Sequence, residues 1–177
     1  MSNVLIGIIG VILFVGLALA GASYLGKEFG DASAKSQAAA ISSVMQQTAH
    51  AATMYQAKRG IQLTGADGPT IVQRLVDSKT LKEYPRNIVN PGNPPIGANI
   101  NGNHRADLPL RLFYMDLGDS EEAREVCRAI ERISGGDDAD QVVDNLNPFR
   151  ERSNSQQRQG CIWNSSYYDR YVAYIMI

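Results

Sequence analysis

The chain has 177 residues, of which 17 are Lys or Arg and 18 are Asp or Glu, so its formal net charge is −1. A balance this close to zero gives no bulk attraction for nucleic acid. Two cysteines and two histidines, with no ligand spacing among them, argue against a metal centre. The length suits one long helix and one modest globular head.

The first third of the chain is predicted to be one continuous helix with two different halves. Residues 1–26 contain no charged side chain, and residues 4–25 are almost wholly apolar. At roughly 1.5 Å per residue, this run is long enough to cross a hydrocarbon core of ~30 Å. The chain is therefore predicted to have three regions. They are a hydrophobic half-helix for a membrane or filament core (1–26), an amphipathic half-helix packed in the head (27–59), and the globular head itself (60–177).

The amphipathic half carries apolar or small residues at intervals of three and four, the spacing of one helix face. They are Ala34, Ala38, Ile41, Met45, Thr48, Ala52 and Tyr55. Gly60, directly after Lys58 and Arg59, predicts the C-terminal end of this helix. No basic residue precedes the apolar run, so we expect either an uncleaved anchor or a chain whose leader has been removed to leave Met1 first.

The next segments are predicted to be a loop (61–69), a short amphipathic helix (70–81) that ends before Pro85, and a turn-rich crossing (87–103). Residues 108–117 are the first convincing strand. A helix capped by Asp119 or Ser120 follows, and its charged residues, Glu131 among them, are expected in solvent. The buried stripe of this helix is predicted to be Ala123, Val126, Cys127, Ile130 and Ile133.

The C-terminal part begins with a polar stretch, 137–159, which lacks the ligand pattern of a calcium loop and is expected to be an exposed segment. Residues 160–163 and 167–177 are predicted to be strands joined by a turn at 164–166. The fold class is therefore α+β. A long N-terminal helix has its amphipathic half packed under a small antiparallel sheet.

Nothing in the sequence resembles a catalytic constellation or a phosphate-binding loop, so we expect no enzymatic activity, cofactor or metal site. His50 and His104 have no evident partners. The tyrosines near the C-terminus suit sheet packing better than base stacking, and no specific nucleic-acid binding is expected. Cys127 and Cys161 predict a disulfide if the head lies outside the cytoplasm; two buried thiols are the alternative inside it.

The order of these elements resembles that of a type IV pilin. Three stretches are similar to the type IVb subclass in particular: TIVQRLVDSKTLKEYPRNIVNPGNP (70–94), LRLFYMDLGDSEEAREVCRAI (110–130) and CIWNSSYYDRYVAYIMI (161–177). They resemble, respectively, the segment after the long helix, a strand leading into the helix with the first disulfide cysteine, and the second cysteine with the closing strands. The likeness spans nearly the whole chain, although no single motif is diagnostic.

The resemblance implies a structural subunit with one disulfide, Cys127–Cys161. Such subunits stay in the bacterial inner membrane, where a prepilin peptidase and an assembly machinery act on them, and then polymerise into an extracellular filament. The filament serves adhesion, conjugation or motility and contacts host or recipient cells. Its core is expected to contain the helix residues Met1, Leu5, Ile9, Leu13, Gly16, Ala18, Gly21, Ala22 and Gly26.

Two departures from the family pattern affect that expectation. Leu5 stands where the family usually has a glutamate, and the first acidic residue is Glu28. Ala22 stands where the family has a helix-breaking proline. The N-terminal amine is therefore expected to use another partner, such as Ser2, Asn3 or a backbone carbonyl. A minor pilin, a pseudopilin of a type II secretion system and a single-span, membrane-anchored periplasmic binding module are the alternatives.

Overall fold

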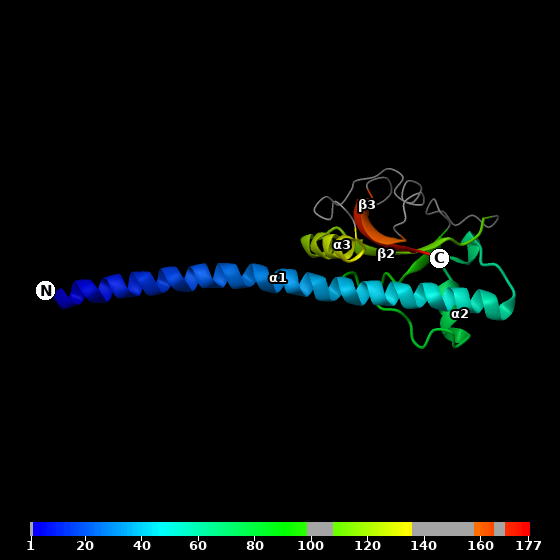
Figure 1. Ribbon diagram of the computed structural model, residues 1–177, viewed down its shortest axis with the longest axis horizontal. Coiled ribbons are helices and arrows are strands. Elements are labelled where there is room, and N and C mark those ends of the chain that lie inside the picture. The colour runs from blue at the N-terminus through cyan, green and yellow to red at the C-terminus, as the bar shows by residue number, and fades with distance from the viewer. Residues whose placement is uncertain (1, 99–107, 136–157, 165–168) are drawn as a thin grey trace. The chain divides into compact units, whose positions relative to one another are not determined.

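The computed structural model describes residues 2–98, 108–135, 158–164 and 169–177 (Figure 1). Within these ranges the side chains of residues 2–10, 22–25 and 27 are not described. The chain divides into two compact units, Met1–Ala34 and Lys35–Ile177.

One uninterrupted helix, α1 (Ser2–Arg59), accounts for the described part of the first unit and begins the second (Figure 1). The helix stops where the sequence predicted. Gly60 has a φ of +64°, and the amides of Gly60 and Ile61 both donate to the Gln56 carbonyl, at 2.9 and 3.3 Å. Among the residues whose side chains are described, no helix is long and apolar enough to cross a membrane. The predicted membrane-spanning half is not found among these residues.

Within the second unit, the predicted buried stripe of α1 is confirmed except at Tyr55, which is only half-buried. Ala38, Ile41, Met45, Thr48 and Ala52 are at most 1% exposed. The Thr48 hydroxyl is satisfied inside the helix because it donates to the Val44 carbonyl at 2.8 Å. Two side-chain hydrogen bonds then fix this part of α1 to the rest of the unit. Gln37 donates to Glu122 at 2.7 Å, and Gln46 donates to Gln159 at 2.9 Å.

The second unit contains a four-stranded antiparallel sheet in the order β1-β2-β4-β3. Its strands are β1 (Ile96–Ala98), β2 (Leu112–Gly118), β3 (Gln159–Asn164) and β4 (Arg170–Met176). The C-terminal strand β4 is central and pairs with both β2 and β3. β2 starts later than the predicted 108 because Pro109 has no N–H to donate; Pro109 forms only an isolated bridge with Thr64. β1 was not predicted.

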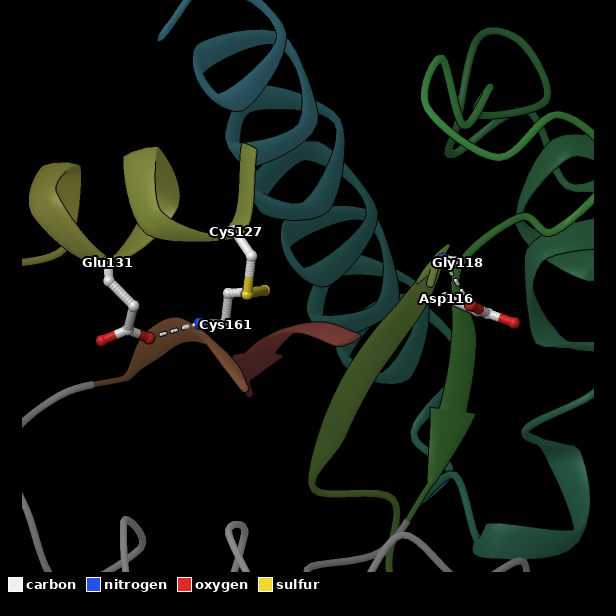
Figure 2. The surroundings of a disulfide bond; sticks show 5 residues. All are labelled: Asp116, Gly118, Cys127, Glu131 and Cys161. Atoms are coloured by element: carbon white, nitrogen blue, oxygen red, sulfur yellow. Dashed lines mark hydrogen bonds between the residues drawn. A yellow bond between two sulfur atoms is a disulfide. The ribbon is translucent and has the colours of Figure 1, made fainter. Parts of the chain in front are cut away.

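Helix α3 (Glu121–Ile133) follows β2, and the Ser120 hydroxyl caps it by accepting the Ala123 amide at 3.1 Å. The predicted stripe is confirmed except at Ile133, which is 53% exposed because the helix ends there. The predicted disulfide is also confirmed: Cys127 of α3 is bonded to Cys161 of β3 (Figure 2). On the other face of the sheet lies a buried cluster of Ala98, Leu112, Ile162, Val172 and Tyr174.

The segment between α1 and the sheet contains less helix than predicted. It contains a 3-10 turn, η1 (Gly65–Asp67), and α2 (Ile71–Asp77). The predicted end near residue 81 is wrong because Lys79 turns the chain with a φ of +57°, and the amides of Thr80 and Leu81 then donate to the Leu75 carbonyl. The predicted turn at 164–166 is wrong at Asn164, which still pairs with Arg170 as the last residue of β3. Residues 165 and 166, most of the polar stretch 137–159 and His104 lie outside the described residues.

Candidate assembly surface

The first unit presents an apolar helix surface to solvent. Residues 11–21 are all exposed, and their large side chains are 48–73% accessible: Val11, Ile12, Leu13, Phe14, Val15, Leu17 and Leu19. Five consecutive residues exceed one helical turn of 3.6 residues, so apolar groups cover every side of the helix. Burying such a side chain contributes about 1.5–3 kcal/mol. Complete burial of these partly exposed side chains would therefore contribute on the order of 10 kcal/mol per subunit.

The predicted filament-core residues divide into described and undescribed ones. Leu13 is 62% exposed, and Ala18, Gly16, Gly21 and Gly26 are exposed as well. Met1 and the side chains of Leu5, Ile9 and Ala22 lie outside the description, although α1 includes all of them except Met1. The predicted residues that can be seen therefore share one solvent-exposed helical segment.

The glycines of this segment have no packing role within the described chain. A Cβ added at Gly16, Gly21, Gly26 or Gly30 would have no described atom within 4 Å, apart from its own helix. Each glycine nevertheless lowers helix stability by roughly 1 kcal/mol relative to alanine. Gly26 and Gly30 continue a four-residue spacing of small residues from Ala18 and Ala22, and such spacing allows close approach of a second helix.

A second surface on α1, in the other unit, was missed by the sequence reasoning. Between Lys35 and Lys58 there is no Asp, Glu, Lys or Arg. Seven exposed residues of this stretch, spaced four and three apart, form what we call the charge-free face: Ser36, Ala40, Ser43, Gln47, His50, Met54 and Ala57. The absence of charge over this length was the available signal. The buried stripe of the same helix is the stronger pattern, because it repeats large apolar residues.

The polar groups on and beside this charge-free face are partly satisfied by the helix itself. Gln47 donates to the Ser43 hydroxyl at 3.1 Å, and the Thr53 hydroxyl donates to the Ala49 carbonyl at 3.1 Å. The exposed face of α3 differs, because it carries the ion pairs Arg124–Glu121 at 3.2 Å and Arg128–Glu125 at 2.8 Å. Covering the charge-free face therefore costs less desolvation than covering the face of α3.

Two of the described carboxylates, Asp67 and Asp116, each form an ion pair with an arginine of the second unit. The best-defined example is Asp67, where burial raises the pKa, but hydrogen bonds from Thr64 and the nearby Arg74 guanidinium outweigh burial and lower it overall. Asp116 pairs with Arg170 at 2.8 Å. Within the described residues, no three His, Cys, Asp or Glu side chains are placed to hold a metal ion.

Comparison with protein families, with curated proteins and with solved structures found no match for this chain.

Proposed function

We propose that the chain is the structural subunit of a type IVb-like pilus, which polymerises through the helix of its first unit into an extracellular filament. Before assembly the subunit is held at the bacterial inner membrane, where a prepilin peptidase and the assembly machinery act on it. The filament serves adhesion, conjugation or motility.

The observation that carries this proposal is the solvent-exposed helix at residues 11–21, apolar on every side. A helix of this kind needs an apolar environment all round, whereas one globular partner covers only one side. Several copies of the same helix, packed side by side, provide a complete apolar surrounding. The gain of on the order of 10 kcal/mol per subunit is comparable with the ~4–15 kcal/mol that association costs in lost freedom.

The small residues and the charge-free face support the same arrangement. Gly16, Gly21, Gly26 and Gly30 weaken the isolated helix without filling any space within the described chain, so their benefit must come from another molecule. The charge-free face, Ser36 to Ala57, gives α1 a second uncharged surface on which copies can approach. Repeated head-to-tail contacts that do not close give an open helical polymer.

Assembly in this chain has to proceed without the glutamate that the resemblance leads one to expect. Because no acidic residue precedes Glu28, no carboxylate in the first half of the helix is available to neutralise a neighbour's N-terminal amine. The apolar and small-residue contacts must then supply the assembly energy. Because these contacts are uncharged, the stability of the filament should depend only weakly on salt concentration.

The test is electron microscopy of material sheared from cells that express the chain with its assembly machinery. We expect thin filaments that contain this chain, and none from Leu13→Asp, because a buried unpaired carboxylate costs several kcal/mol per subunit. Leu13 is exposed in the isolated subunit, so the second unit should fold normally, and an immunoblot of the membrane fraction checks that the variant is still held there despite its carboxylate. Glu121→Ala, which changes an exposed residue of α3, is the control. Normal filaments from Leu13→Asp would refute the proposal, and membrane-bound wild-type subunits without filaments would favour an anchored binding module.

A further inference from the structure

The two outer strands of the sheet each have an internal group bonded to the edge that pairs with no described strand. Among the described strands, β1 and β3 end the order β1-β2-β4-β3. An edge strand presents unpaired N–H and C=O groups, and these can pair with a strand of another molecule unless something occupies them.

At β1 the edge is occupied by the chain's own backbone. The amide of Gly97, the middle residue of β1, donates to the Gly68 carbonyl at 3.2 Å. A Cβ at Gly97 would lie 2.7 Å from Leu110 Cδ1 and 3.3 Å from Gly68 Cα. Glycine therefore permits the close approach that closes this edge.

At β3 the edge is occupied by a side chain. The Met176 amide of β4 donates to the Arg158 carbonyl at 2.8 Å, so even-numbered residues on this side direct their backbone groups toward β4. The alternation of an antiparallel ladder then directs those of Cys161 outward. The outward Cys161 amide donates to the Glu131 carboxylate of α3, as Figure 2 shows. Glu131 is only 3% exposed.

A glycine again makes room for this contact. A Cβ at Gly160 would lie 2.5 Å from Glu131 Oε1 and 2.8 Å from the Tyr174 hydroxyl oxygen. Any larger residue at 160 would push the carboxylate away from the edge. The disulfide reinforces the arrangement, since Cys127, which precedes Glu131 by one helical turn, is bonded to Cys161 itself.

We propose that Glu131 is an edge cap, which prevents β3 from pairing with the same strand of a second copy of this chain. The carboxylate occupies the outward amide of Cys161, so that this amide cannot donate to the carbonyl oxygen of an approaching strand. A protein that brings many copies of its head together benefits from such a cap, because the edge would otherwise offer a competing route of association. The cap itself does not depend on the proposed filament.

The experiment compares Glu131→Ala, Glu131→Gln and Gly160→Ala in the full-length chain in detergent, without the assembly machinery. Amide hydrogen exchange at Cys161 and light scattering are measured for each variant. Glu131→Ala and Gly160→Ala should exchange Cys161 roughly tenfold faster and form concentration-dependent oligomers. Glu131→Gln keeps an acceptor oxygen and should resemble the wild type. Glu125→Ala, at a half-exposed position of the same helix, is the control.

Two results would overturn the proposal. One is a Cys161 amide in the wild-type protein that exchanges as fast as an unprotected amide. This measurement does not depend on the folding of any variant. The other is a Glu131→Ala protein that keeps its disulfide and its near-ultraviolet circular dichroism and yet has the oligomeric state of the wild type. Both readouts are made on unassembled protein, so failure of the filament proposal would leave them unaffected.

Discussion

Replacing Gly26 by leucine should have opposite effects on the isolated helix and on assembly. A Cβ at Gly26 has no described neighbour within 4 Å outside its own helix, so the leucine fits without a clash in the single subunit. Helix propensity then makes the substitution stabilising, by about 0.8–1 kcal/mol. Sequence reasoning that treated the glycine as an internal packing requirement would predict the reverse.

In the filament the same leucine should be harmful. If Gly26 lies at a close helix–helix contact, the added side chain overpacks it, at a cost of about 1–3 kcal/mol. Since 1.4 kcal/mol corresponds to a factor of ten in an association constant, the concentration of subunit required for assembly should rise roughly 5- to 150-fold. Gly26→Ala adds one methyl group and should fall between the wild type and Gly26→Leu.

The assay pairs two measurements on each variant. Helix content against temperature, from far-ultraviolet circular dichroism in detergent, reports the isolated subunit, and the yield of sheared filaments reports assembly. Greater helix stability together with loss of filaments is the expected pattern for Gly26→Leu. If this variant assembles at the wild-type yield, the reasoning from open glycines to helix contacts is refuted.

Three further predictions concern the second unit. Replacing Cys127 and Cys161 by serine removes a bridge between positions 34 apart and should lower the free energy of unfolding by about 4 kcal/mol in denaturant titration; an unchanged midpoint would contradict this. Asn87→Ala removes hydrogen bonds to the Asn93 and Asp116 carbonyls and from two backbone amides, with an expected loss of roughly 2–4 kcal/mol in the same titration. Asp67→Asn should reduce the pH dependence of stability in acid. The lowered pKa of Asp67 adds stability above a carboxyl's ordinary value of about 3.9, and that stability disappears as the pH falls through the folded value. An equally steep loss of stability in acid for Asp67→Asn would show that other groups cause the pH dependence.

Strong local patterns made much of the fold predictable. The three-and-four spacing from Ala38 to Ala52 identified the buried side of α1, and Gly60 marked its end because glycine adopts a positive φ at little cost. The Ser120 cap and most of the stripe of α3 followed from equally local chemistry. The disulfide followed from having only two cysteines, both in one domain.

The errors arose where long-range contacts decided the outcome. β1 has three residues, too few for a periodic pattern, and it exists because β2 pairs with it. Glu131 was expected in solvent because it belongs to a run of charges. The signal that it is buried was its position one turn after Cys127, on the side of the helix that faces β3. Lys79 ended α2 early with a positive φ, which sequence alone rarely predicts for lysine.

The candidate assembly surface was only partly predictable. An apolar run longer than a helical turn indicates a surface that must be covered, and the sequence shows it directly. The open surroundings of Gly16, Gly21 and Gly26 required coordinates, because a sequence does not reveal whether a glycine faces a neighbour within its own chain. The charge-free face likewise became visible only when the exposed side of α1 was known.

The most direct test of the account is a cryo-electron microscopy reconstruction of the sheared filaments. The proposal predicts helices of the first unit packed against one another along the filament axis, with Leu13 and Phe14 enclosed by helices of neighbouring copies. A filament built by contacts between second units alone, with Leu13 and Phe14 left exposed to solvent, would contradict it.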